Sequence, residues 1–169
     1  NLNTVTDGSN GNHLKGMINV PLIDETLALR AVAYRTGYAG FIDALGENGS
    51  VKSDVNDGYR SGGRVSLTYK PNDEWTITPR VIMQNINTNG SNRQEVFNLF
   101  ANPNTTTRPA IELGEREQYL LLDEAFEDET LIADLTVEYE TANIDYSLIY
   151  SYTDREILVS RDASALTGS

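Results

Sequence analysis

The sequence predicts an all-β protein: an antiparallel up-and-down meander of about six strands that forms part of a transmembrane β-barrel. Three observations support this prediction. Apolar and polar residues alternate with a period of two, the connections between the alternating segments are short at one end and long at the other, and aromatic residues gather near segment ends. A period of two places successive side chains on opposite faces of a strand, whereas a helix repeats every 3.6 residues. The length of 169 residues suits one domain.

The alternation is clearest in three segments. In residues 63–70, Gly, Val, Leu and Tyr share one face, and Arg, Ser, Thr and Lys share the other. In residues 131–140 the odd positions are apolar and the even ones, apart from Ile132, are polar. From Ile144 to Tyr152 the even positions carry Ile, Tyr, Leu, Tyr and Tyr. A helix would bury a polar group on every turn of such patterns, so strands are expected. With three weaker segments included, the expected strands cover about 13–20, 26–42, 61–70, 75–88, 130–140 and 144–159.

Two of the weaker segments carry irregularities. The alternation of residues 26–42 blurs after Val32. Pro79 lies in the middle of residues 75–88, and proline has no N–H to donate to a neighbouring strand. A bulge or a weakened pairing is therefore expected at Pro79.

The connections differ in length at the two ends of the meander. Residues 21–25, 71–74 and 141–143 are short and contain Pro, Asp or Asn, which favour tight turns. The connections of about 43–60 and 89–129 are long. Short turns at one end and long loops at the other are typical of outer-membrane barrels, whose long loops face the outside of the cell.

Composition excludes several classes of protein. Acidic residues outnumber basic ones by 25 to 13, giving a net charge of -12, which argues against nucleic acid as a partner. There is no Cys, so disulfide scaffolds and thiol catalysis are excluded. His13 is the only histidine, which argues against a multi-histidine metal site. No catalytic constellation stands out, so neither an enzyme nor a cofactor or metal site is expected.

The apolar face of such a meander fits two environments. It can pack against a second sheet in a soluble β-sandwich, or it can meet lipid while the polar face lines a wet lumen. Aromatic residues at the lipid headgroup level favour the second reading, although tyrosine also has a high strand propensity. The candidates for an aromatic girdle are Tyr69, Trp75, Tyr139, Tyr146, Tyr150 and Tyr152.

Charged residues occupy the polar face of the expected strands. A solvated lumen accommodates them, and so does the wet outer face of a sandwich. Ion pairing across strands is the expected role, ahead of contact with a plug or a passing solute. The lumen-lining candidates are Arg30, Arg64, Arg80, Asp134 and Glu138.

The second long connection holds the densest cluster of acidic residues. Carboxylates there could bind a cation or select ligands, but a solvated external loop is the favoured interpretation. His13 is expected to be a polar strand residue near the external rim. The acidic loop comprises Glu112, Glu115, Glu117, Asp123, Glu124, Glu127, Asp128 and Glu129.

Three stretches resemble the early barrel strands of TonB-dependent outer-membrane receptors. They are residues 15–30 (KGMINVPLIDETLALR) followed by Ala33 and Tyr34, residues 62–69 leading to 71–77, and residues 151–155 (SYTDR). The resemblance spans about residues 11–161. It implies a 22-stranded barrel with an N-terminal plug, which imports a scarce nutrient such as a ferric siderophore using energy relayed by TonB.

The sequence departs from that pattern in extent, because it shows no plug and no TonB box. We therefore expect residues 1–169 to be a partial barrel domain, since single-chain barrels begin at about eight strands. The expected location is the outer membrane of a Gram-negative bacterium. The expected partners are outer-membrane lipid, TonB through a segment missing here, and an external small molecule such as an iron chelate. A passive porin-like barrel and a soluble β-sandwich that binds a partner are the alternatives.

Overall fold

The computed structural model describes residues 1–94 and 111–164, and its elements are nearly all strands. The six long strands are β2 (Asn10–Ile23), β3 (Leu27–Tyr38), β6 (Gly58–Tyr69), β7 (Trp75–Thr88), β9 (Ala125–Glu140) and β10 (Asp145–Ser160). The short elements are β1 (Leu2–Thr4), β4 (Asp43–Leu45), β5 (Val51–Lys52), β8 (Glu117–Tyr119) and the 3-10 turn η1 (Glu47–Gly49). In the described part of the chain, no helix is long and apolar enough to cross a membrane.

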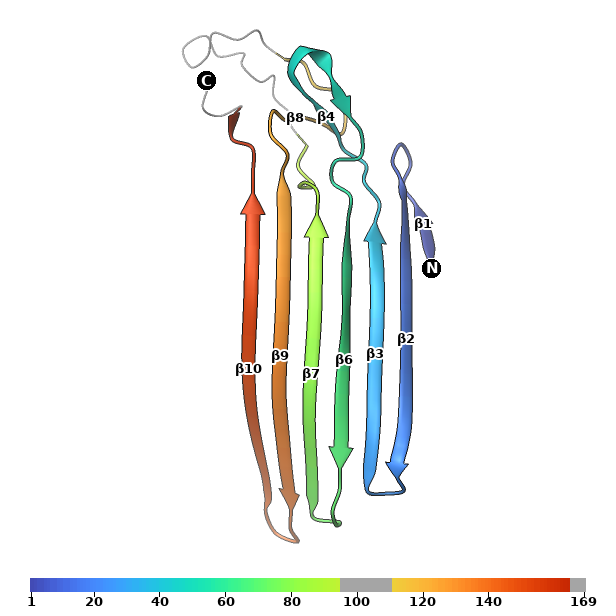
Figure 1. Ribbon diagram of the computed structural model, residues 1–169, viewed down its shortest axis with the longest axis vertical. Coiled ribbons are helices and arrows are strands. Elements are labelled where there is room, and N and C mark those ends of the chain that lie inside the picture. Colours follow the sequence, from blue (N-terminus) through green and yellow to red (C-terminus); the bar gives the residue numbers. More distant parts are fainter. Residues whose placement is uncertain (95–110, 165–169) are drawn as a thin grey trace.

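The six long strands and the short β1 form one antiparallel sheet of seven strands in the order β1-β2-β3-β6-β7-β9-β10. Figure 1 shows them side by side, with the three short turns at one end and the long connections at the other. The predicted all-β class and antiparallel meander are confirmed. The sheet is open: every residue of β10 is exposed, and β1 covers only the first residues of β2.

Two of the three short turns, which lie at the lower end of Figure 1, are closed by side-chain hydrogen bonds. The Oδ1 atom of Asn72 accepts hydrogen bonds from the backbone N–H groups of Glu74 and Trp75, both at 3.1 Å. Thr141 Oγ1 accepts one from the N–H of Ile144 at 3.0 Å. Short Asn and Thr side chains can replace backbone partners in this way, which makes them common in tight turns. These turns fix the register of the strands that they connect.

The irregularity expected at Pro79 lies on one side of its strand. Between β6 and β7 the pairing runs from Gly58 to Ser66 and resumes at Tyr69, so the segment opposite Pro79 is unpaired. On its other side Pro79 stays paired with Leu135 of β9. The weakened pairing is confirmed, and the register is the same before and after the gap. The register shift in the sheet falls instead at Pro21, where β2 pairs with β3.

Several expected boundaries were wrong at the end with the long connections. The segment expected as a strand over 26–42 ends at Tyr38, and β6 and β9 begin at Gly58 and Ala125, earlier than expected. The two long connections also form a second sheet of three strands, in the order β5-β4-β8. In it β4 and β8 run parallel, although they are about 70 residues apart in the sequence. Periodicity cannot reveal two-residue and three-residue strands whose partners come from different loops.

The buried apolar core is small and belongs to this end of the molecule. It consists of Ile42, Ala44 and Val55, with Phe41 and Leu120 packed against it. Asn56 fixes the loop beside it, because its Oδ1 accepts hydrogen bonds from the N–H groups of Phe41 and Ile42. The large sheet itself packs against no second layer in the described residues.

Candidate functional site: the polar face of the sheet

At the centre of the sheet, in β7, the two faces differ in exposure, and the difference is the reverse of that in a soluble sheet. In the edge strand β10 both faces are exposed. In β7, Pro79, Val81 and Met83 are exposed, whereas the residues that alternate with them (Arg80, Ile82 and Gln84) are half-buried. In water, an amphipathic sheet buries its apolar face and exposes its polar one. In this strand the polar face is the more enclosed of the two.

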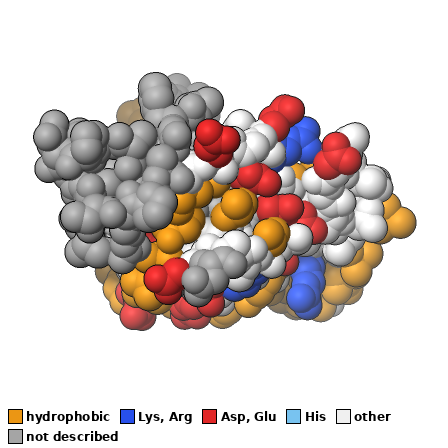
Figure 2. All heavy atoms as spheres, turned by 90° about the horizontal axis from the view of Figure 1, so that it is seen from above, with side chains coloured by type: hydrophobic (Ala, Val, Ile, Leu, Met, Phe, Trp, Pro, Cys, Tyr) orange, Lys and Arg blue, Asp and Glu red, His pale blue; other side chains and the backbone are white. Residues whose placement is uncertain are grey.

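The exposed face carries a continuous apolar band across the six long strands. In β9 the band covers the nine residues from Leu131 to Tyr139, whose odd members are all apolar. The register places apolar residues beside all five in β7 and beside four of them in β10, where Asp154 lies opposite Leu131. Leu14, Met83, Leu148 and Tyr150 are each at least 59% exposed. Seen along the strands, hydrophobic side chains form much of the lower and right-hand rim (Figure 2).

Aromatic residues mark the edge of this band beside the short turns. Trp75 pairs with Tyr139, which pairs with Tyr146. The ring centroids of Trp75 and Tyr139 are 4.4 Å apart, and those of the two tyrosines are 6.3 Å apart. Tyr69 lies one row further in, opposite Ile77. Tyr150 and Tyr152 lie opposite Leu135 and Ala133, near the middle of the band and away from this row.

All five lumen-lining candidates lie on the opposite, polar face. The register of the strands places each of them on the side away from the apolar band. The face continues unbroken over the long strands. Arg30 pairs with Ser66, Ser66 with Arg80, and Arg80 with Asp134. Arg80 Nη2 lies 2.8 Å from Asp134 Oδ2, and the Asp134 side chain is only 6% exposed. The expected cross-strand ion pairing is therefore confirmed for Arg80 and Asp134. The two remaining candidates on this face are Arg64, opposite Val32, and Glu138, opposite Thr76.

The structure adds a cluster on the polar face that the sequence interpretation missed. Tyr34 of β3 lies across Gly62 of β6, and its hydroxyl group donates a hydrogen bond of 2.8 Å to Gln84 Oε1 of β7. The guanidinium carbon of Arg60 lies 5.3 Å from the centre of the Tyr34 ring. Arg60 was missed because the strand was expected to begin at residue 61. The alternation Arg60, Gly62, Arg64 was the available signal.

A cavity of about 690 Å³ opens at the end of the polar face beside the long connections. Residues from both flanks of the sheet line it, among them His13 and Thr36 from one flank and Phe126 and Val159 from the other. The cavity therefore extends across the width of the sheet. His13 Nδ1 lies 2.7 Å from Thr36 Oγ1, which is consistent with the expected place of His13 on a strand near this rim.

The prediction of a single solvated acidic loop is wrong. Glu117 lies in β8, and Glu127, Asp128 and Glu129 lie in β9. Glu124 and Asp128 are only 4% and 3% exposed. Both are buried because basic residues reach them from elements distant in the sequence.

These contacts link Glu124 to Arg93 and Asp128 to Arg155. Glu124 accepts hydrogen bonds from Arg93 Nη2 at 3.3 Å and Ser91 Oγ at 3.1 Å. Asp128 receives two hydrogen bonds from the Arg155 guanidinium, one from Nε at 2.9 Å and one from Nη2. Arg155 had no assigned role in the sequence interpretation, because its partner was expected to lie in a loop.

Asp162 ties the end of β10 to this network. Burial opposes ionisation of its carboxyl group, but hydrogen bonds from Ser164 and from the N–H groups of Leu121 and Leu122 outweigh that effect. Together they lower the pKa of Asp162 to about 2 from the ordinary value of 3.8. The N–H of Asp162 in turn donates to Glu124 Oε1 at 3.1 Å.

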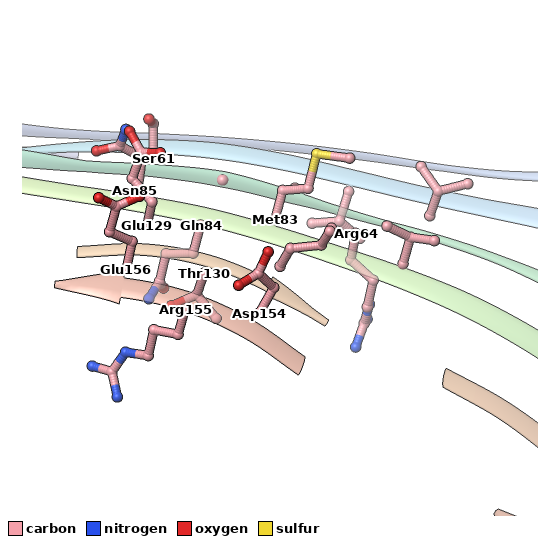
Figure 3. A pocket seen from close by; sticks show the side chains of 16 residues that line it. Ser61, Arg64, Met83, Gln84, Asn85, Glu129, Thr130, Asp154, Arg155 and Glu156 are labelled. Carbon is pink, nitrogen blue, oxygen red and sulfur yellow. The ribbon is translucent and has the colours of Figure 1, made fainter. Parts of the chain in front are cut away.

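A second hollow, of about 870 Å³, lies on the exposed apolar face where the band gives way to polar residues. Met83, Val65 and Leu131 line its apolar part, and Glu129 and Asp154 line its acidic part. In Figure 3, Ser61 and Met83 lie on one side of the sheet while Arg64 and Arg155 extend to the other. Around this hollow, Glu129 and Asp154 thus belong to the apolar-band face, and Arg64 and Arg155 to the polar face.

Among the described residues, no group of three or more His, Asp or Glu side chains could hold a metal ion. Comparison with protein-family models, curated proteins and solved structures found no match. The functional argument therefore depends on the geometry of the two faces.

Proposed function

We propose that this chain forms part of the wall of an outer-membrane transport receptor, with its apolar band against lipid and its polar face lining the lumen. The observation that most directly supports this proposal is the exposure pattern of β7. Its apolar residues Pro79, Val81 and Met83 are exposed, and the residues that alternate with them are half-buried. A transmembrane β-barrel requires this arrangement, because its strands are apolar outside and polar inside.

The dimensions of the band support the proposal. A transmembrane strand needs about 9–11 residues to cross the hydrocarbon core. The nine residues from Leu131 to Tyr139 meet that requirement. The row formed by Trp75, Tyr139 and Tyr146 matches the aromatic girdle expected where the band meets headgroups.

The open edges of the sheet indicate that further strands complete the barrel. Backbone N–H and C=O groups at an open edge find no partner in lipid, which makes an open sheet unstable there. The exposed edge of β10 and the lower edge of β2 are the positions where such strands would pair.

A receptor is favoured over a passive pore because the long-connection end carries its own folded structure. The sheet β5-β4-β8 and the cavity of about 690 Å³ offer a surface that could capture a ligand before transport. The resemblance to TonB-dependent receptors supplies the remaining elements of the proposal: energy from TonB and a scarce nutrient, such as a ferric siderophore, as the ligand.

The test is the size and location of the native polypeptide. An antibody against residues 112–123 is used to probe outer membranes and the soluble fraction, with boiled and unboiled samples compared on gels. We expect a heat-modifiable band several times larger than 18.7 kDa in the outer membrane. A band near 18.7 kDa in the soluble fraction would refute the proposal and leave the soluble sandwich. A heat-modifiable band whose protein conducts ions freely in planar bilayers would replace the receptor with a passive pore.

A further inference from the structure

Positive charge is concentrated on the polar face, although the chain as a whole carries a net charge of -12. Thr136 pairs with Thr78 and Ile149 in one row across the sheet. Between this row and the long connections, the only acidic side chains that the register places on the polar face of the described long strands are Asp128 and Asp134. Glu127, Glu129, Asp154 and Glu156 belong to the opposite face, whereas Glu138, Glu140 and Asp145 lie on the polar face between that row and the short turns. The basic residues on the polar face are Lys15, Arg30, Arg60, Arg64, Arg80 and Arg155.

Of the five arginines on this face, two pair with a carboxylate inside the sheet; in the described part of the chain Arg30, Arg60 and Arg64 do not. Arg80 pairs with Asp134, and Arg155 pairs with Asp128. No carboxylate among the described residues pairs with Arg60 or Arg64, and the buried Nε atom of Arg60 has no hydrogen-bond partner there. Both side chains are half-buried, so their positive charge is less screened than at an open surface.

The position of Arg60 is fixed by its neighbours. The ring of Tyr34 fills the space above Gly62, where a side chain would collide with it, and the hydrogen bond to Gln84 holds its hydroxyl group. The Arg60 guanidinium lies over that ring at 5.3 Å, within the range of a cation–π interaction. Arg64 follows on the same face of the same strand, on the other side of Gly62. Two half-buried arginines without a carboxylate partner therefore lie on the same face of β6, one of them over the Tyr34 ring.

We propose that Arg60 and Arg64 form a binding site for the oxyanion group, carboxylate or phosphate, of a small solute. Guanidinium groups bind such planar or tetrahedral anions through two parallel hydrogen bonds, and a partly enclosed site strengthens the contact. A basic face on an acidic protein also concentrates anions locally. Its positive charge attracts them, while the negative charge of the rest of the protein repels them. In the proposed receptor this site lies on the lumen wall, below the cavity of about 690 Å³. The inference depends on the proposed function for that location alone.

The chain supplies a matched control on the other face. Arg35 of β3 lies over Tyr59 of β6, with its guanidinium carbon 5.4 Å from the ring centre. This pair joins the same two strands as Arg60 and Tyr34. The register places it on the apolar-band side of the sheet, where acidic residues of β9 and β10 also lie.

The test is calorimetric titration of the purified native polypeptide with citrate at low ionic strength, with sorbitol as the uncharged comparison. We expect citrate to bind and sorbitol not to bind. R60Q and R64Q should each weaken citrate binding about tenfold or more, the loss of one hydrogen-bonded charge contact, while R35Q changes it less than twofold. Binding should also weaken as salt is raised, because screening reduces the attraction.

Two results would overturn the proposal: no citrate binding by the wild type, or an equal loss in R35Q and R60Q. Unchanged gel mobility and circular dichroism establish that each variant is folded. The titration also separates this proposal from the proposed function. Citrate binding by a polypeptide that is soluble without detergent would retain the oxyanion site and refute the receptor.

Discussion

Replacing Leu135 with arginine tests whether the apolar band faces lipid. Leu135 lies four residues from Tyr139 and four from Leu131, the two ends of the band in β9. At about 3.4 Å per residue, it is roughly 14 Å along the strand from either border. Its side chain is on the exposed face, opposite Pro79 and Tyr150. Leu135 therefore falls at the midplane of the proposed bilayer.

The expected cost follows from that depth. An arginine at the bilayer midplane on the lipid face of a barrel destabilises it by about 2–4 kcal/mol, and the cost falls toward zero near the interfaces. We therefore expect Leu135→Arg to lower the free energy of unfolding by about 2–4 kcal/mol. Thr136→Arg, one residue further on and on the polar face, should cost less than about 1 kcal/mol, because its guanidinium remains solvated.

The assay is denaturant unfolding of the native polypeptide refolded into lipid vesicles. The midpoints of the two variants are compared at equal slope, so that a changed midpoint reports stability alone. The slope also checks that both variants bury the same surface. Equal penalties for the two substitutions, or a larger one for Thr136→Arg, would refute the assignment of the two faces.

Three further predictions use the same unfolding measurement. Gly62→Ala should destabilise by about 1–3 kcal/mol, because its new methyl group collides with Tyr34 and with backbone, whereas Gly16→Ala, in open space, should be neutral or slightly stabilising; equal effects would contradict the packing. Asp134→Asn should lower the free energy of unfolding by about 1 kcal/mol, because it removes the charge that pairs with Arg80. This loss should shrink at high salt, and a loss that salt does not change would argue against an electrostatic origin. The lowered pKa of Asp162 stabilises the fold above the unfolded pKa of 3.8 by about 2 kcal/mol, and this is lost as pH falls toward 2. Asp162→Asn should therefore differ from the wild type at pH 6 and converge toward it at pH 2, and a constant difference would contradict this.

The folded end of the molecule shows where sequence reasoning reached its limit. Residues 89–129 read as one long acidic loop because their charges obey no period. In the structure Glu124 and Asp128 are buried, and each is held by an arginine more than 25 residues away in the sequence. Residues 95–110 of the predicted long connection lie outside the described residues.

Local alternation determined the strands of the large sheet, because a period of two depends only on neighbouring residues and on which face each one occupies. The same alternation assigned Arg30, Arg64, Arg80, Asp134 and Glu138 to one face, since side-chain parity along a strand needs no knowledge of its partners. The sequence also determined the short turns, through the side chains of Asn72 and Thr141.

Only the tertiary structure decided which charges meet. Strand order and register brought Arg80 to Asp134 and left Arg60 and Arg64 without a carboxylate, although all four residues follow similar alternating patterns. The same register placed the Tyr34 ring over Gly62, from a strand 28 residues earlier. Contacts of this kind depend on long-range pairing, which neither the composition nor the period of a single segment contains.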